Sequence, residues 1–196
     1  MTQRISKTYR STNETQIEAT VNLDGTGVSQ INTGLGFLDH MLDAFSRHSG
    51  IDITLQCDGD LVIDDHHSIE DCALALGHTI DEALGDRTGI TRFSSAYAPL
   101  DESLARVVID FSGRSYASIE LGFVREMIGR VATENITHFF ESLAMNMRAT
   151  LHIDLIRGRN DHHKAEAAFK ALALAMRDAI RITRGDTIPS TKGTLS

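Results

Sequence analysis

The sequence of 196 residues has little of what marks several large classes of protein. It contains no tryptophan, two prolines, two cysteines and only 6% aromatic residues. So few aromatic side chains argue against a stacking platform for single-stranded nucleic acid. Cys57 and Cys72 lack the CxxC spacing of a thiolate metal site, and a disulfide is unusual in a reducing compartment. We therefore interpret both cysteines as core or bystander residues.

Positive charge and long apolar runs are also scarce. The 19 Lys and Arg are outnumbered by 27 Asp and Glu, and the net charge of −8 with His neutral disfavours a surface that tracks nucleic-acid phosphates. No stretch approaches the roughly 20 apolar residues of a membrane helix, and the opening MTQRISKTYRST has no apolar signal region. We expect a cytoplasmic protein with no nucleic-acid partner and no membrane partner.

Histidine, by contrast, is abundant, and six of the nine histidines follow an internal repeat. His40 lies among apolar residues in LGFLDHML, and His138 does so in NITHFFE, 98 positions later. The block DHHxxE at residues 65–70 recurs at residues 161–166, 96 positions later. Because order and spacing are both kept, we infer the duplication of a unit of about 90 residues.

Within each unit, the hydrophobic pattern predicts strands, a helix, a strand and a second helix. Alternating strands are predicted at residues 15–23, 51–55 and 151–155. The β-rich runs 104–111 and 115–123 are expected to form a hairpin through Ser112-Gly113-Arg114. Apolar steps of three and four predict a long helix from each DHHxxE block, with Asp65 and Asp161 as N-caps. Shorter helices are predicted at residues 37–45 and 136–147.

These elements predict an α+β fold of two duplicated half-units, each a β-sheet with helices packed on one face. The boundaries that we expect are residues 1–90 for the first half-unit, residues 91–185 for the second and residues 186–196 for a C-terminal tail. With 41% hydrophobic residues, a chain of this length has enough apolar surface for a real core.

The repeated histidines and glutamates predict a pair of metal sites. Helix neighbours point about 100° apart, whereas residues three or four apart share a face, so the glutamate of HHxxE joins one histidine of the pair and not both. Our hypothesis for one metal is His40, His67, Glu70 and His162. The other metal would then take His66, His138, His163 and Glu166. The exchange of partners between the two sites stays open.

Imidazole and carboxylate ligands without thiolate suit Mn, Fe, Co, Ni or Zn. Other interpretations of the same residues are plainer. Each histidine pair also fits a solvated helix start, and Glu70 and Glu166 are favoured by the helix dipole in a first turn whatever their function. The three histidines without a counterpart in the other half are interpreted as surface or core residues. They are His48, His78 and His152.

Longer motifs extend the evidence beyond the histidines. They are LGFLDHML, DDHHSIED, APLDESL at residues 98–104, SGRSY at residues 112–116, HFFESL, NDHHKAEAAFKA and the tail TIPSTKG. Together they make the chain, from Arg4 to Ser196, similar to the imidazoleglycerol-phosphate dehydratase family of histidine biosynthesis. Ser115 departs from the SGRPY of that family, a change that affects turn rigidity more than function.

The resemblance implies a lyase that converts D-erythro-imidazoleglycerol phosphate to imidazole acetol phosphate. It implies ferredoxin-like (S5 domain 2-like) half-domains and a homo-oligomer, a 24-subunit shell built from trimers. It also implies two manganese ions per subunit, held by the eight His and Glu residues named above, in sites completed between neighbouring subunits. The small phosphorylated imidazole substrate is then the expected partner.

The expected chemistry follows from the substrate. The proton to be removed lies on a carbon without an adjacent carbonyl. If both ring nitrogens bind metal, the ring is held as an imidazolate whose electrons expel the neighbouring hydroxyl to give a diazafulvene. A positioned base then removes the acidified proton. The resemblance matches that base to Glu14. It matches the phosphate-binding residues to Arg92, Arg114, Ser190 and Lys192.

Two other functions fit parts of the pattern. A binuclear hydrolase of phosphate esters would also use two metals and arginines, but such enzymes usually bridge their metals with aspartates in DxH-type clusters. A metal store or metal-assembled shell protein is the alternative without catalysis. Ferritin-like sites, however, use the order Glu-x-x-His in long bundle helices, which is the reverse of the order here.

Overall fold

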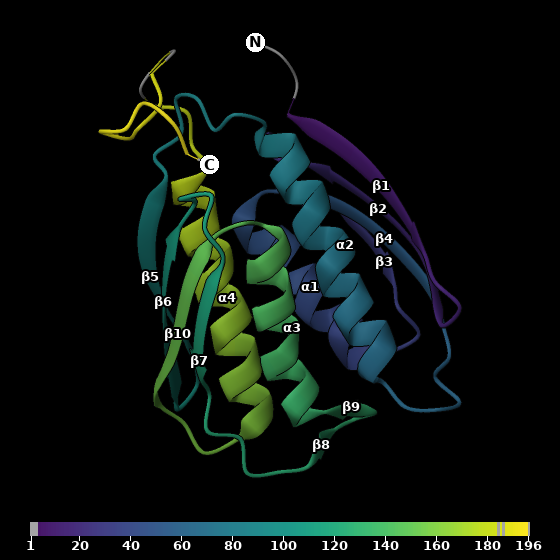
Figure 1. The fold of residues 1–196 in the computed structure, drawn as a ribbon. Coiled ribbons are helices and arrows are strands. Elements are labelled where there is room, and N and C mark those ends of the chain that lie inside the picture. The colour runs from purple at the N-terminus through teal and green to yellow at the C-terminus, as the bar shows by residue number, and fades with distance from the viewer. Residues whose placement is uncertain (1–3, 184, 186, 196) are drawn as a thin grey trace.

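The computed structural model describes residues 4–183, 185 and 187–195, and its helices lie between two outer sheets (Figure 1). The elements of the first half are β1 (Ile5–Ser11), β2 (Thr15–Asn22), β3 (Ser29–Asn32), α1 (Gly36–Ser49), β4 (Asp52–Gly59) and α2 (His66–Leu84). Those of the second half are β5 (Phe93–Leu100), β6 (Ser103–Asp110), β7 (Tyr116–Glu120), β8 (Met127–Ile128), β9 (Val131–Ala132), α3 (Thr133–Asn146), β10 (Thr150–Arg157) and α4 (Asp161–Ala179).

The two sheets have equivalent strand orders, which confirms the α+β fold with two half-domains. The first sheet runs β1-β2-β4-β3 and the second runs β5-β6-β10-β7. In each sheet the third strand of the half pairs in parallel with the strand that follows its first helix, and the other pairs are antiparallel. The helices cover the inner face of both sheets (Figure 1).

Period-two patterning places the core on that inner face. On β2, Ile17, Ala19 and Val21 are fully buried, while the residues between them face outward. On β4, Ile53 and Leu55 are buried in the same way. The apolar stripes of α1 and α2 pack against the first sheet and those of α3 and α4 against the second, and together they form a single core cluster.

The predicted hairpin of residues 104–111 with 115–123 is wrong. Strands β6 and β7 do not pair, because β10 lies between them in the sheet. Strand β6 instead forms its hairpin with β5, through the turn at Asp101 and Glu102, and pairs with β10 on its other side. The inward positions of β5 hold small residues, Ser94, Ala96 and Ala98. The alternation of apolar and polar residues that predicts a strand is therefore weak in β5 on the side that faces the core.

Neither predicted N-cap residue caps its helix with its side chain: Asp65 holds the N-cap position of α2 without a side-chain cap bond, and Asp161 is the first residue of α4. The side chain of Asn160 caps α4 by accepting from the backbone N–H two residues later, at 3.0 Å. Asp64 makes the equivalent contact before α2, at 2.8 Å. Asp65 and Asp161 are buried instead, and their carboxylates accept N–H groups of the segment that leads into α3. They fix the metal-site helices to that segment.

Asp161 also forms a buried ion pair that holds the first turn of α4. Its Oδ1 lies 2.7 Å from Lys164 Nζ, and the side chains are 1% and 4% exposed. Burial alone would raise the pKa of Asp161, but Lys164 and the N–H groups of Arg125 and Val124 hold the pKa below its usual 3.8. The ion pair of Asp161 therefore stabilises the fold fully above pH 3.8, and this stabilisation is lost as the pH falls through the lowered pKa of Asp161.

Lys164→Met is expected to lower the free energy of unfolding of the metal-free protein by about 3 kcal/mol, because it leaves a buried carboxylate without its cation. Urea unfolding at neutral pH measures the change. The double variant Asp161→Asn/Lys164→Met is the control and should recover part of the loss. A Lys164→Met protein as stable as the wild type would contradict this role of the pair.

Within the described ranges, no helix has the length and apolar character needed to cross a membrane.

Candidate metal centre

Two groups of ligand-type side chains converge where helices of different halves meet. The first cluster consists of His40 from α1 with His162 and Glu166 from α4. Glu166 Oε2 lies 3.3 Å from His40 Nε2 and 3.4 Å from His162 Nε2. The donor atoms of the three residues all lie within 4.8 Å of one another. The packing of α1 against α4 brings them together, since His162 and Glu166 share one helix face at i, i+4 spacing.

The second cluster repeats this arrangement with the roles of the halves exchanged. It consists of His66 and Glu70 from α2 with His138 from α3. Glu70 Oε1 lies 3.3 Å from His138 Nε2, and Glu70 Oε2 lies 3.8 Å from His66 Nε2. The rings of His66 and His138 are stacked with centroids 5.0 Å apart. The α2–α3 contact therefore builds the counterpart of the α1–α4 site.

The chemistry of these donors fits a divalent metal. His138 Nε2 is buried and has no hydrogen-bond partner among the described residues, which leaves its lone pair free for a ligand. His66 Nδ1 contacts Asn135 Oδ1 at 3.0 Å, so its Nε2 is directed at the cluster, as in metal-binding histidines generally. Two imidazoles and one carboxylate leave further coordination positions open on Mn²⁺ or a similar ion.

The grouping within one chain differs in part from the sequence hypothesis. His40 does lie with His162, and His66 does lie with His138, as predicted. The glutamates are exchanged: Glu166 belongs to the first cluster and Glu70 to the second. Each glutamate joins the histidine four residues before it rather than the one three residues before it. The remaining two histidines, His67 and His163, belong to neither cluster.

His67 points toward a different set of residues. Its Nδ1 lies 3.0 Å from Asp60 Oδ2, and its Nε2 lies 3.6 Å from Oε1 of Glu14, the predicted base. The hydrogen bond to Asp60 raises the pKa of His67, with a smaller contribution from Glu14. Glu14 is half-exposed in the turn between β1 and β2. The sequence prediction missed Asp60, which has no repeated motif around it.

His163 has an equivalent carboxylate neighbour. Its Nδ1 lies 2.7 Å from Glu102 Oε2, which raises the pKa of His163. The backbone N–H of Asn160, the His163 ring and the backbone N–H of Arg159 hold the pKa of Glu102 far below its usual range. Glu102 is therefore a carboxylate at any ordinary pH. The sequence prediction assigned no role to Glu102, although this residue lies in the APLDESL motif at residues 98–104.

The predicted phosphate-binding residues gather at the opposite end of α4. The guanidinium of Arg92 pairs with Asp110 and donates to the carbonyl of Pro189 at 2.8 Å, which ties the tail to this end. The backbone N–H of Arg92 donates to the carbonyl of Ala179, the last residue of α4. The exposed Arg114 lies three residues after Phe111, the residue that follows β6. The backbone N–H of Phe111 donates to the carbonyl of Arg92.

Two further predicted residues, Ser190 and Lys192, lie in the tail that follows, and the backbone N–H of Lys192 donates to Ser190 Oγ. Ala179 lies 17 residues after His162 in α4, which corresponds to about 25 Å of helix. The four phosphate candidates of one chain are thus remote from the first cluster of the same chain.

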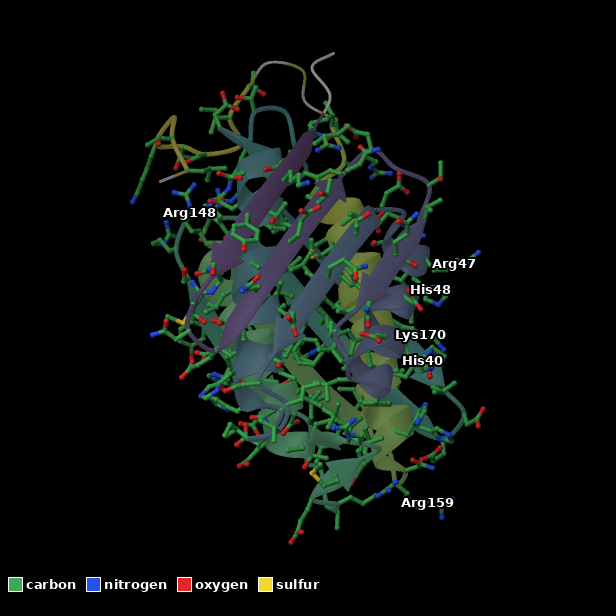
Figure 2. All side chains as sticks on the ribbon, turned by 90° about the vertical axis from the view of Figure 1, so that its right-hand side faces the viewer. His40, Arg47, His48, Arg148, Arg159 and Lys170 are labelled. Atoms are coloured by element: carbon green, nitrogen blue, oxygen red, sulfur yellow. The ribbon has the colours of Figure 1, made fainter. Side chains whose placement is uncertain are left out.

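Positive side chains that the sequence prediction did not assign lie beside the first cluster. Figure 2 shows His40, Lys170, His48 and Arg47 along one edge of the molecule. Lys170 Nζ lies 2.8 Å from Glu166 Oε1, and Lys170 also contributes, after burial, to the lowered pKa of His48. In the sequence, the i, i+4 spacing of Glu166 and Lys170 could have indicated that Lys170 lies beside the cluster. This edge, which we call the positive edge, carries two charged bases, Arg47 and Lys170, of which Lys170 is paired with Glu166.

Comparison with known sequences gives a consistent result. A sequence model of the family "Imidazoleglycerol-phosphate dehydratase" matches residues 33–176. A relative with that name from Chlorobaculum parvum is 56% identical over 195 residues, and the match covers all of both chains. One from Methanothermobacter thermautotrophicus is 52% identical over 195 residues with the same coverage. One from Phytophthora nicotianae is 54% identical over 187 residues, and this chain spans 41% of its length.

Solved structures agree with the sequence matches. Imidazoleglycerol-phosphate dehydratase from Staphylococcus aureus subsp. aureus N315 superposes with a TM-score of 0.83 at 40% identity, covering 91% of this chain and 99% of that one. The Pyrococcus furiosus protein in complex with (S)-C348 superposes with a TM-score of 0.79 at 35% identity, covering 96% of this chain and 100% of that one.

Proposed function

This chain belongs to the imidazoleglycerol-phosphate dehydratase family, lyases of the dehydration step in histidine biosynthesis, and we propose that it performs that step with two divalent metal ions per chain. Its substrate would be D-erythro-imidazoleglycerol phosphate and its product imidazole acetol phosphate. The observation that carries the proposal is the pair of His₂Glu clusters, which are related by the internal repeat. Manganese is the metal that we propose, from the family resemblance and the ligand types.

The chain's own residues account for metal binding and for the proton transfer. The first cluster would hold one metal through His40, His162 and Glu166, and the second would hold the other through His66, Glu70 and His138. Bound there, the metals would supply Lewis-acid stabilisation to the substrate imidazole as its neighbouring hydroxyl is lost. Glu14 then accepts the carbon-bound proton at a carboxylate oxygen.

We propose that neighbouring chains complete each site. His67 and His163 lie outside both clusters of their own chain, and their side chains are partly exposed. The phosphate candidates are about 25 Å of helix away from the first cluster, whereas a substrate of this size spans roughly 10 Å. A homo-oligomer that brings one chain's tail to another chain's cluster resolves both separations. The 24-subunit assembly of trimers implied by the resemblance is such a homo-oligomer.

In that arrangement the phosphate is bound by Arg92, Arg114, Ser190 and Lys192 of one chain. The positive edge of the neighbour, which includes Lys170, faces the same anion. Arginine suits this role because its planar guanidinium forms paired charge-assisted hydrogen bonds with phosphate oxygens.

Glu14→Gln is expected to lower kcat by about 10²- to 10⁴-fold, because the amide cannot accept the substrate proton. The affinity for substrate should change little, and calorimetry on the metal-loaded variant measures it. Glu18→Gln is the matched control, since Glu18 is an exposed acid on β2 paired with Lys7. Wild-type turnover of the Glu14→Gln enzyme would remove Glu14 from the mechanism.

Deletion of residues 188–196 is expected to raise the KM at least about tenfold, because the substrate phosphate loses two of its proposed partners. Steady-state kinetics against imidazoleglycerol phosphate measures the effect. A thermal melt of the truncated protein checks that it remains folded. An unchanged KM in a folded protein would exclude the tail from substrate binding.

Anomalous diffraction at the manganese edge tests the metal sites directly. The expected result is two peaks per chain, one at each cluster, with His67 and His163 of neighbouring chains among the ligands. A single peak per chain, or ligands outside the eight named residues, would overturn the two-metal proposal.

A further inference from the structure

Two carboxylates outside the clusters make the same contact in the two halves of the molecule. Asp60 Oδ2 lies 3.0 Å from Nδ1 of His67, and Glu102 Oε2 lies 2.7 Å from Nδ1 of His163. These are the two histidines that lie outside the clusters of their own chain. In both dyads the carboxylate engages the ring nitrogen nearer the backbone, so the distal Nε2 is the atom left for a ligand.

The rings of the dyads stand edge-on to those of the adjacent cluster histidines. The planes of His66 and His67 meet at 74° with centroids 5.9 Å apart. Those of His162 and His163 meet at 87° with centroids 6.1 Å apart. Each histidine pair therefore presents one ring to a cluster of its own chain and the other ring to a carboxylate outside that cluster.

The backbone holds the second dyad rigidly. The other carboxylate oxygen of Glu102 accepts the backbone N–H groups of Arg159 and Asn160, at 3.0 and 2.8 Å. These residues immediately precede α4, so the carboxylate is fixed to the start of the helix that carries His163. Asp60 is fixed through its backbone N–H, which donates to the carbonyl of Glu14 at 3.1 Å.

The two carboxylates do not occupy equivalent positions of the repeat. Glu102 precedes β6, and the residue that precedes the equivalent strand β2 is Glu14. Asp60 comes two residues after Asp58, which pairs with Gln16 of β2, and the equivalent pair in the second sheet is Arg157 with Leu104 of β6. The residue equivalent to Asp60 is therefore Arg159, which has no carboxylate.

The same contact is thus built twice from different positions, so the duplication alone does not explain it. In the first half Asp60 takes the Nδ1 contact, and Glu14 is free to lie beside Nε2 instead. The catalytic base proposed above is available only because another residue orients His67.

We infer that Asp60 and Glu102 are positioning residues that hold His67 and His163 with Nε2 directed outward, as ligands for the metals of neighbouring chains. The inference rests on the proposed function. A carboxylate on Nδ1 fixes the tautomer and the orientation of a metal-binding imidazole and raises its basicity. Removing either carboxylate should therefore weaken metal binding without unfolding the chain.

The test uses full-length Asp60→Ala and Glu102→Ala, with Asp58→Ala and Glu120→Ala as controls, since both control residues are exposed acids in the same sheets. Free Mn²⁺ is followed by electron paramagnetic resonance as metal-stripped protein is titrated. Light scattering gives the particle mass. We expect about 10- to 100-fold weaker Mn²⁺ binding in the two variants and wild-type binding in the controls.

A double-mutant cycle separates positioning from general structural damage. Asp60→Ala/His67→Ala should bind Mn²⁺ no more weakly than His67→Ala alone, because Asp60 acts through His67. Additive losses would overturn the inference. If an alanine variant fails to fold in the metal-free state, Asp60→Leu and Glu102→Leu replace it, because leucine also cannot accept a hydrogen bond from Nδ1, and unchanged Mn²⁺ affinity in the folded leucine variants would equally overturn it.

The wild-type protein distinguishes this inference from the proposed function. A wild type that binds no manganese, or that binds it without dehydrating the substrate, contradicts the proposed function. A wild type that does both, beside alanine variants with unchanged Mn²⁺ affinity and particle mass, contradicts the role of Asp60 and Glu102 alone.

Discussion

Replacing Glu166 with glutamine is expected to reduce dehydration by about 1,000-fold or more, because the first cluster loses its only carboxylate and a metal supplies several kcal/mol of stabilisation to such a reaction. Metal analysis of the purified variant should give one manganese per chain instead of two. The second cluster is built by other helices and should keep its ion.

The His78–Glu82 pair on α2 provides a matched control. It has the same i, i+4 spacing, with 3.4 Å between its closest atoms, but lies outside both clusters. Glu82→Gln should retain two metals and wild-type turnover. A Glu166→Gln enzyme with the same properties would exclude the first cluster as a metal site.

Mixing two inactive variants is expected to restore activity if neighbouring chains share the site. One partner carries Glu166→Gln and the other lacks residues 188–196. Each should be nearly inactive alone at substrate concentrations below the wild-type KM. The two variants are stripped of metal, mixed in equal amounts and reloaded with Mn²⁺. Half of the chains then carry an intact cluster and half carry an intact tail, so no more than about a quarter of the shared sites should combine the two.

That fraction exceeds the activity of either parent, since a tenfold higher KM leaves the truncated parent about a tenth of the wild-type rate at low substrate. Mixing the same proteins without prior metal removal is the control, and it should restore less activity if assembled particles exchange chains slowly. If the remetallated mixture has no more than the sum of the parental activities, each chain completes its own site, and the 25 Å separation along α4 must be bridged by a rearrangement of the tail.

Much of this molecule could be predicted from sequence because the duplication gives each observation twice. The offset of His40 and His138 and that of the DHHxxE blocks identified both half-units and the helices that carry the ligands. The repeat also predicted that His40 lies with His162 and that His66 lies with His138. These features depend on local periodicity and repetition, which sequence patterns record well.

Other features depend on tertiary contacts that no local pattern records. Strand β10 enters the sheet between β6 and β7, so neighbours in sequence are not neighbours in the sheet. The glutamate of HHxxE had two histidines within reach, and the packing of α1 on α4 selected the one four residues away. Asp60 and Glu102 reach their histidines from loops in different parts of the repeat, which spacing alone does not reveal.

The alternatives to a lyase account for fewer of the residues. A metal store requires the clusters but has no use for the positive edge at Lys170 or for an acid beside His67. A phosphate-ester hydrolase would use the arginines, but within the described chain each candidate cluster contains one glutamate and no bridging aspartate. The dehydratase assigns a role to the clusters, to Glu14 and to the tail together.

The most direct test of the central claim is to titrate metal-stripped protein with Mn²⁺ while dehydratase activity on imidazoleglycerol phosphate and particle mass are followed together. We predict that activity and a large assembly appear together and saturate near two manganese ions per chain. Metal uptake and assembly without turnover would contradict the dehydratase and leave a metal-assembled shell protein in its place.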